Sequence, residues 1–365
     1  MNICISQFLT DYPYFFAIVS FAFGFVCMPA VVEIAKKRDF VVKPNKRTSH
    51  EGAIPNVGGI NIFISFFLTV IIFSFQVISQ WQFLFVGVFF ILIVGFVDDL
   101  IDIRAFWKLV GQLLGGFFLI VVSDIRLSGF HGFLGIYELP LWFSYLVSFF
   151  VYIVVVNALN LIDGVDGLAS GLGILYCLFF GFYFTLTGNP NLAVCAFTLV
   201  GGLAVFFIYN VFGKRNKIFM GDCGSLFLGY MINLFVFQFC ELNAQHNVPE
   251  ELHMPAAPAV AICVLLIPLF DTMRVMLTRI KRGYSPFSPD RNHIHHLLLK
   301  IGLKHRQVTF VLLVESLFFI ILGLLGRNGS IGLLTAIVAI LMTLTTYVIW
   351  RLVDKKETEK IEKTD

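Results

Sequence analysis

Four polar residues at a constant spacing of three interrupt an otherwise apolar sequence between residues 157 and 167. Asn157 and Asn160 lie three residues apart and are expected to share one face of a helix end. A glycine after each aspartate allows a sharp turn, so that Asp163 and Asp166 can point back into the same space. Two amides and two carboxylates would then converge, and oxygen ligands of this kind suit a hard cation such as Mg²⁺. The segment therefore predicts a site for a charged ligand.

A second acidic pair, Asp98 and Asp99, ends an apolar run. The simplest interpretation is that these acids cap a membrane span where it meets water. Two adjacent carboxylates repel each other, however, so a nearby cation is needed to keep both ionised near lipid. A metal ion can supply that charge, and so can a lysine such as Lys43, Lys46 or Lys108.

The segment Gly221-Asp222-Cys223-Gly224-Ser225 precedes another apolar run. In one interpretation it is an ordinary helix start, with Asp222 or Ser225 as the N-cap and glycine for the turn. In the other, the unpaired N–H groups of the helix N-terminus bind a phosphate, and the Asp222 carboxylate holds a metal that bridges phosphate oxygens.

Three histidines fall within four positions of a later loop, at His293, His295 and His296. Zinc binding by two of them would need donors from elsewhere, because no Cys or Glu lies close by in the sequence. Hydrogen bonding to a phosphorylated or sugar ligand is favoured instead, since Arg291 adds a fixed positive fork to the same loop.

The composition is that of an all-α polytopic membrane protein. Of the 365 residues, 58% are hydrophobic and 13% charged, and the mean hydropathy is +0.87, which excludes a soluble globule. The seven cysteines are scattered without a Cys-x-x-Cys pair, which argues against a disulfide framework or a zinc site. We expect membrane lipid around the chain and no nucleic-acid partner.

Eleven apolar runs are long enough, or nearly so, to cross a bilayer. They lie at about 12–35, 57–78, 82–97, 105–123, 140–160, 168–187, 190–212, 224–240, 256–278, 308–326 and 329–350. An odd number of spans puts the termini on opposite sides. An outside N-terminus leaves 24 of the 26 Lys and Arg residues inside, with only Arg126 and Arg327 outside, so the positive-inside rule favours that orientation.

This topology predicts a single transmembrane catalytic domain at 1–350 and a charged cytoplasmic tail at 351–365. All the segments that carry candidate site residues then become cytoplasmic loops, at 36–56, 98–107, 157–167, 213–225 and 279–307. A transporter of an anionic ligand is an alternative, but it would place its charges near the midplane and show repeat symmetry, whereas these acids sit at span ends. In a purely structural membrane protein, every motif would be only a helix cap or a turn. The presence of four such motifs on one face argues against that explanation.

Together the motifs resemble those of the polyprenyl-phosphate N-acetylhexosamine-1-phosphate transferases, over about residues 36–299. The resemblance rests on Asp98-Asp99, Asn157-x-x-Asn160-x-x-Asp163-Gly164-x-Asp166-Gly167, Phe219-Met220-Gly221-Asp222-x-Gly224-Ser225 and His293-x-His295-His296. The stretch 286–296 is similar to the WecA-like branch of the family. It departs from the His-His-His-Phe-Glu loop of the branch that takes UDP-MurNAc-pentapeptide.

The resemblance implies transfer of N-acetylglucosamine 1-phosphate from UDP-GlcNAc to undecaprenyl phosphate, with release of UMP, at the bacterial cytoplasmic (inner) membrane. The product would be the first lipid-linked sugar of a surface glycan, such as O-antigen or enterobacterial common antigen. Another UDP-N-acetylhexosamine such as UDP-GalNAc, or UDP-MurNAc-pentapeptide, remains an alternative donor. The implied cofactor is Mg²⁺, for which Mn²⁺ can substitute because both take hard oxygen ligands.

The resemblance also implies residue roles. Asp222 and Asn160 would hold the Mg²⁺, while Asp163 and Asp166 would line the nucleotide pocket. Asp98 and Asp99 would handle the lipid phosphate, with Asp98 as general base or as an orienting group, since a phosphate monoester is mostly dianionic at pH 7 and has little need of a base. Further substrate contacts are expected at Lys46, Arg47, His50, Asn157, Arg291, His293, His295 and His296.

Overall fold

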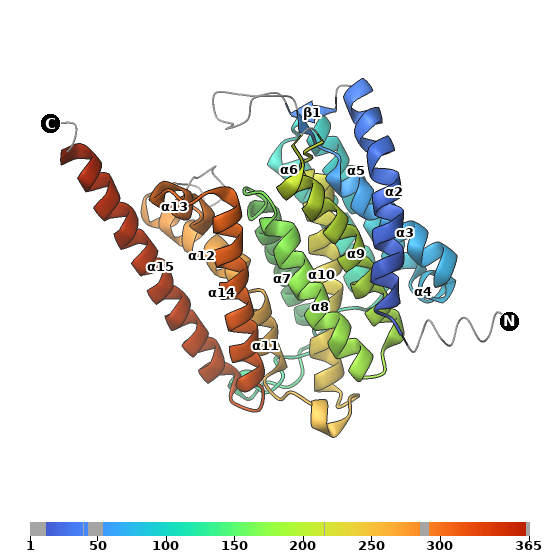
Figure 1. Cartoon of the computed structure of the whole chain (residues 1–365). Coiled ribbons are helices and arrows are strands. Elements are labelled where there is room, and N and C mark those ends of the chain that lie inside the picture. The colour runs from blue at the N-terminus through green and yellow to red at the C-terminus, as the bar shows by residue number, and fades with distance from the viewer. Residues whose placement is uncertain (1–11, 39, 43–53, 215, 285–291, 363–365) are drawn as a thin grey trace.

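The computed structural model describes residues 12–38, 40–42, 54–214, 216–284 and 292–362, and these are largely helical (Figure 1). The longer helices are α2 (Phe15–Lys37), α3 (Gly58–Phe73), α5 (Gln82–Ile101), α6 (Ala105–Phe117), α7 (Leu141–Leu161), α8 (Leu168–Leu186), α9 (Pro190–Phe212), α10 (Gly221–Ala244), α12 (Leu266–Lys281), α14 (His305–Leu325) and α15 (Ile331–Glu362). The short elements are β1 (Val41–Val42), β2 (Ile54–Pro55), α4 (Phe75–Gln80), the π-helical turn η1 (Phe118–Val122), the 3₁₀ turns η2 (Phe133–Gly135) and η3 (Glu250–Leu252), α11 (Ala257–Val264) and α13 (Ile294–Ile301).

Every predicted apolar run forms a helix or a pair of helices, which confirms the all-α polytopic class. Among the described residues, nine helices are long and apolar enough to cross a membrane. The run at 256–278 is divided into α11 and α12, which meet at 79°. The run at 57–78 is divided between α3, which has only 16 residues, and α4.

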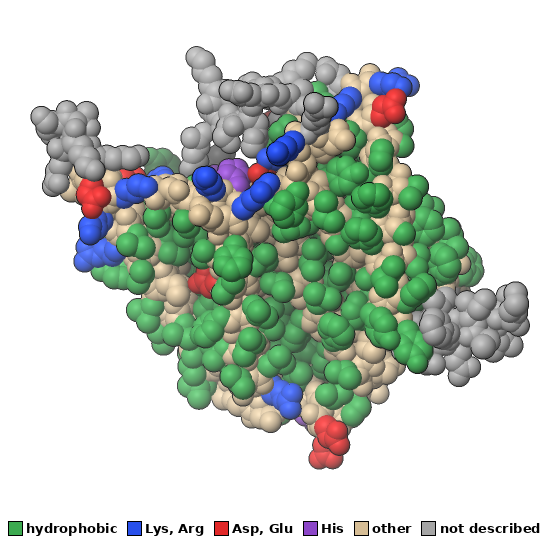
Figure 2. Space-filling model, in the orientation of Figure 1, with side chains coloured by type: hydrophobic (Ala, Val, Ile, Leu, Met, Phe, Trp, Pro, Cys, Tyr) green, Lys and Arg blue, Asp and Glu red, His purple; other side chains and the backbone are tan. Residues whose placement is uncertain are grey.

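The described parts of the segments singled out by the sequence lie at one end of the helix bundle, the end that carries β1 and α13 (Figure 1). On the face shown in Figure 2, Lys and Arg side chains gather along this end, above a broad hydrophobic surface. Such a surface suits the hydrocarbon core of a bilayer. The orientation of this end toward the cytoplasm stays a prediction from the positive-inside rule.

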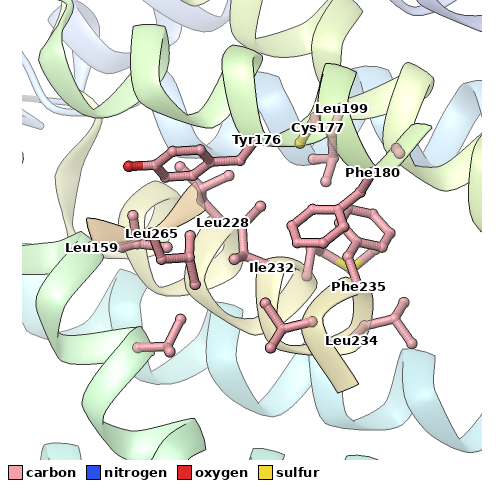
Figure 3. Close-up of a cluster of buried hydrophobic side chains, with 14 of the residues drawn as sticks. Leu159, Tyr176, Cys177, Phe180, Leu199, Leu228, Ile232, Leu234, Phe235 and Leu265 are labelled. Carbon is pink, nitrogen blue, oxygen red and sulfur yellow. The ribbon is translucent and has the colours of Figure 1, made fainter. Parts of the chain in front are cut away.

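Helix α10 forms the core of the bundle. In its most apolar stretch 94% of the residues are buried, against 22% for α15 and 28% for α2. Apolar side chains of α10 pack against α8, where Ile232 and Phe235 lie near Tyr176 and Phe180 (Figure 3). Because α10 touches α3, α5, α7 and α8, its N-terminus is surrounded by the ends of those helices.

Glycines let two of these helices approach the N-terminus of α10. A Cβ added at Gly95 of α5 would lie 2.5 Å from the Cα of Cys223, and one added at Gly59 of α3 would overlap the backbone of Gly224. No larger residue fits at either crossing without moving a helix. This close packing brings the end of α5 next to the first turn of α10.

The outermost helix, α15, continues past its apolar stretch to Glu362. The expected charged tail at 351–365 is therefore a helical extension of the last span as far as residue 362. Its side chains are mostly exposed, but Val353 is buried and Lys356 half-buried, so the extension packs on the protein.

Candidate active site

Asp222 lies in the first turn of α10, at the meeting point of three other helix ends. Its Oδ1 accepts a hydrogen bond of 2.7 Å from the Asn160 side chain at the end of α7. Its Oδ2 contacts the ammonium of Lys108 in the first turns of α6. The same ammonium lies 2.9 Å from Oδ2 of Asp98. Lys108 is thus the cation between the acids, one of the three lysines that the sequence offered for that place.

Asp99 has a different environment from its neighbour Asp98. Its carboxylate accepts hydrogen bonds from the backbone N–H groups of Asp222 (2.8 Å) and Cys223 (3.0 Å) and from the Asn56 side chain (2.9 Å). These bonds satisfy two of the N–H groups that a helix N-terminus leaves unpaired. The expectation that Asp222 or Ser225 caps this helix is wrong, because the residue at the N-cap position is Met220 and Asp99 supplies the acceptor.

Asp163 lies between α7 and α8 and is half-buried. Within the described part of the chain, no residue donates a hydrogen bond to its carboxylate. Burial raises the pKa of the Asp163 carboxyl well above its ordinary value, and the negative charges of Asp222, Asp99 and Asp166 raise it further. A cation bound between Asp163 and its acidic neighbours would stabilise the ionised form of this carboxyl.

Asp166 is paired with bases instead. Its Oδ2 lies 2.7 Å from the Lys217 ammonium and 3.3 Å from Nδ1 of His305. Burial raises the pKa of the Asp166 carboxyl, but hydrogen bonds from His305 and Lys217 and the charge of Lys217 outweigh it, so the net pKa lies below the ordinary value. Asp166 is therefore a fixed negative charge flanked by two basic groups.

The two asparagines of the 157–167 segment share the end of α7 as predicted, but they take different partners. Asn160 donates to Asp222 and, at 2.8 Å, to the hydroxyl of Ser225. Asn157 exchanges hydrogen bonds with the side-chain amide of Gln112 on α6. The expected convergence of two amides and two carboxylates thus becomes one amide on the Asp222 carboxylate and one amide that ties α7 to α6.

His293 is buried and bound to Asp271 near the middle of α12. Its Nδ1 lies 2.9 Å from one carboxylate oxygen of Asp271, while the other oxygen accepts 2.9 Å and 2.7 Å bonds from the backbone of Ile294 and from Arg274. Asp271 therefore caps α13 from a neighbouring helix, as Asp99 caps α10. His293 serves first to fix the start of α13.

His295 is buried against the 157–167 segment. A Cβ added at Gly164 would lie only 2.6 Å from Nε2 of His295, which explains this glycine by space. Gly164 is not in the left-handed region, whereas Gly167 turns the chain there with φ of +76°. Burial, and then the proximity of His296, lowers the pKa of His295 to about 3, so the ring is neutral. The half-buried His296 lies beside it, with ring centroids 4.3 Å apart.

Four predicted site residues lie outside the described residues, namely Lys46, Arg47, His50 and Arg291. Three residues that the sequence did not single out join the site. Asn56 follows β2 without any sequence signal for its role. Lys217 entered only the count of basic loop residues, His305 entered no prediction, and nothing in the sequence pairs either residue with Asp166.

Within the described ranges, no three His, Cys, Asp or Glu side chains are grouped closely enough to form a ready metal centre. The donors present still fit a hard divalent ion. Asp222 and the unpartnered Asp163 are half-buried carboxylates, and Mg²⁺ commonly takes only one or two protein ligands together with waters and substrate phosphates. The Lys108 ammonium beside Asp222 shows that this place attracts positive charge.

These features define an integral membrane protein with an acidic, base-flanked site at one end of its bundle. Residues 81–239 match the glycosyl transferase family 4 model. The chain is 31% identical to the undecaprenyl-phosphate α-N-acetylglucosaminyl 1-phosphate transferase of Yersinia pestis, over 87% of this chain and 84% of that protein. It is 30% identical to the Escherichia coli K12 protein of the same name, over 81% and 78% of the two chains. It is also 31% identical to a probable undecaprenyl-phosphate N-acetylglucosaminyl 1-phosphate transferase of Bacillus subtilis, over 89% and 88%.

The chain belongs to this family of glycosyl-1-phosphate transferases, as its motifs indicated.

Proposed function

We propose that this protein transfers N-acetylglucosamine 1-phosphate from UDP-GlcNAc to undecaprenyl phosphate and releases UMP. An oxygen of the lipid phosphate forms a bond to the phosphorus that carries the sugar. The bond from that phosphorus to the bridging oxygen breaks, and the oxygen leaves on UMP. The proposal is supported by the names of relatives that match most of the chain.

The observation that carries the proposal is the meeting of Asp98, Lys108, Asn160 and Asp222 from four separate helices. Both substrates are anions, so the reaction needs positioning and neutralisation of charge more than it needs proton transfer. A purely structural role would not require the half-buried Lys108 and the three acids Asp98, Asp99 and Asp222 to lie at one helix terminus.

The donor set supports a divalent cation at Asp222 and Asp163, and Mg²⁺ or Mn²⁺ fits because both accept oxygen ligands. When bound there, the ion supplies positive charge to the pyrophosphate of the nucleotide sugar. The side-chain amide of Asn160 donates a hydrogen bond to the Asp222 carboxylate. We therefore assign Asn160 to orienting that carboxylate toward the ion.

For the lipid phosphate, Asp98 and Lys108 are the proposed contacts. The Lys108 ammonium can neutralise the incoming phosphate, and Asp98, 2.9 Å away, holds the ammonium in place. Asp99 is occupied by three hydrogen bonds, so we assign it to positioning the first turn of α10. This division favours Asp98 as an orienting group over Asp98 as a general base.

For the nucleotide sugar, the proposed contacts are Asp166, Lys217, His295 and His296. Asp166 keeps its charge because Lys217 and His305 stabilise it, so it can accept hydrogen bonds from uridine. Neutral His295 can accept or donate one hydrogen bond to the sugar or its phosphate. We place this site on the cytoplasmic face of the bacterial inner membrane, where nucleotide sugars are made available to the chain.

Transfer is tested with purified protein in detergent, UDP-GlcNAc labelled in its β-phosphate, undecaprenyl phosphate and Mg²⁺. We expect label in a butanol-soluble lipid. Asp222→Asn should lower the rate by at least about a hundredfold, because it removes a charge from the centre of the site. The matched control is Asp124→Asn, since Asp124 is exposed at the opposite end of the bundle and its positive φ suits asparagine.

Equal rates in Asp222→Asn and in the control would contradict the proposed site. Competition among UDP-GlcNAc, UDP-GalNAc and UDP-MurNAc-pentapeptide then identifies the donor. We expect unlabelled UDP-GlcNAc to compete best. Removal of divalent ions with EDTA should stop transfer, and added Mg²⁺ or Mn²⁺ should restore it.

A further inference from the structure

The short helix α13 carries His295 and His296 in its first turn, and α13 has only eight residues. A helix of this length is not stable in water by itself, so its position depends on contacts with the rest of the protein. Asp271 holds its first turn through the backbone N–H of Ile294. The apolar side chains of Ile294, Leu297 and Leu298 are buried beneath it.

The other end of α13 is held by α15. Lys356 donates a hydrogen bond to the backbone carbonyl of Ile301, the last residue of α13. Gly302 follows in the left-handed region with φ of +98°, and a Cβ added there would meet the Lys356 ammonium. A lysine at this place satisfies one of the unpaired carbonyls and complements the negative end of the helix dipole.

We propose that Lys356 is a positioning residue for the nucleotide sugar, an inference that rests on the proposed function. By binding the last turn of α13, Lys356 fixes where His295 and His296 meet the substrate. His295 precedes Ile301 by six residues, a distance of about 9 Å along a helix. A shift at the far end of α13 therefore moves the His295 ring, whose Nε2 already lies close against Gly164.

The rest of the α15 extension contributes little to this contact. Lys355 and Glu357 are exposed on either side of Lys356. The Lys300–Glu357 pair is 4.0 Å long between exposed side chains, and such pairs stabilise proteins weakly. Val353 is buried one turn earlier and keeps the extension packed. At the C-terminal end of α13, the polar contact with α15 that remains is the hydrogen bond from Lys356 to the carbonyl of Ile301.

The test uses the full-length enzyme with saturating undecaprenyl phosphate and varied UDP-GlcNAc. Lys356→Met keeps the length of the side chain and removes its charge and donors. We expect it to raise the KM for UDP-GlcNAc about five- to tenfold, as for the loss of one charge-assisted hydrogen bond. The KM for undecaprenyl phosphate should stay unchanged. Lys356→Arg should restore the wild-type value, and Lys355→Met is the matched control.

Hydrogen exchange gives a second measurement that does not depend on turnover. Peptides that cover α13 should exchange faster in Lys356→Met than in Lys355→Met, while peptides from α10 should not change. A deletion of residues 354–365 also removes Lys356 and should reproduce both effects.

A wild-type enzyme that transfers sugar phosphate, with the same KM and exchange in both lysine variants, would overturn the inference and leave the proposed function intact. A wild-type protein that transfers no sugar phosphate would overturn the proposed function itself.

Discussion

Lys108 is the residue on which the electrostatics of the site depend. Its ammonium contacts both Asp98 and Asp222, and its side chain is only 18% exposed. In that environment two carboxylates without a cation would repel each other at short range. The lysine therefore keeps the acids together when no divalent ion is bound, and an ion near Asp222 would share that task.

The variant Lys108→Met tests whether Lys108 and a divalent ion both neutralise the acids. We expect it to destabilise the protein by about 1–3 kcal/mol, because it leaves two partly buried carboxylates without their cation. Added Mg²⁺ should then raise the melting temperature of the variant more than that of the wild type, since the ion replaces the missing charge. The measurement is thermal unfolding in detergent with and without Mg²⁺. Equal shifts in both proteins would argue against an ion near Asp222.

His295 predicts a pH dependence of stability. Its pKa is about 3 in the folded protein against an ordinary 6.5, so the unfolded chain binds a proton that the folded chain does not. The contribution of His295 to the free energy of unfolding is complete above pH 6.5, and it is lost as the pH falls toward 3. At pH 5 the loss is about 2 kcal/mol for one such group.

The measurement compares His295→Gln with the wild type by thermal unfolding between pH 7 and pH 5. Because glutamine does not titrate, the melting temperature should fall more between pH 7 and pH 5 for the wild type than for the variant. Parallel curves would show that His295 is protonated without penalty. The comparison cancels the titration of all other groups that the two proteins share.

At the scale of elements, two helices with site residues are capped by carboxylates from other helices. Asp99 of α5 binds the first N–H groups of α10, and Asp271 of α12 binds that of Ile294 in α13. A cap from a neighbouring helix fixes the direction of the capped helix as well as its end. Asp222 and His295 are placed in this way.

Gly221 is the turn that makes the first of these caps possible. Its φ is +72°, and an added Cβ would lie 2.5 Å from Oδ2 of Asp99. Gly188 has the same φ, with nothing within 4 Å of an added Cβ. Both Gly→Ala variants should lose about 1 kcal/mol from backbone strain, but Gly221→Ala should lose more stability and most of its transfer activity.

Thermal unfolding and the butanol-extraction assay measure these two effects, and the difference between the two variants isolates the contacts with Asp99 and Asn56. If both alanine variants behave alike, the turn at Gly221 matters only for its backbone angle.

The sequence was sufficient for the helices and insufficient for the pairing of polar side chains. Apolar runs of span length predicted the long helices, because backbone groups in a bilayer must be paired within the chain. The short α13 was expected to be part of a loop. The 79° bend between α11 and α12 was not predicted, since both halves of that run are apolar. Asp222 and Asn160 were predicted together from motif and resemblance. The Asn157–Gln112 and Asp166–Lys217 pairs were not, because they join residues far apart in the chain and depend on how helices rotate against one another.

For the whole molecule, the main consequence of the fold is that all described site residues share one end of the bundle. Lys and Arg side chains gather at that end (Figure 2), and the positive-inside rule predicts that it faces the cytoplasm. A cytoplasmic site can meet a water-soluble nucleotide sugar and a lipid phosphate at the same membrane surface. A site on the other side would have no supply of the donor.

Cysteine labelling tests this orientation. In a variant whose seven native cysteines are replaced, Lys355→Cys should react with an impermeant maleimide only after the cells are permeabilised. Glu250→Cys, an exposed residue at the opposite end, should react in intact cells. The reverse pattern would place the site in the periplasm and exclude the proposed reaction.

The cap that Asp99 places on α10 also bears on biosynthesis. The hydrogen-bonded partners are 123 and 124 residues apart in the chain, so a ribosome must finish α10 before α5 can dock against it. Until then the acidic end of α5 has no helix terminus to bind. Nascent chains that stop before α10 should therefore insert into the bilayer yet transfer no sugar phosphate, and activity should emerge only after α13, which carries His295 and His296, has also been made.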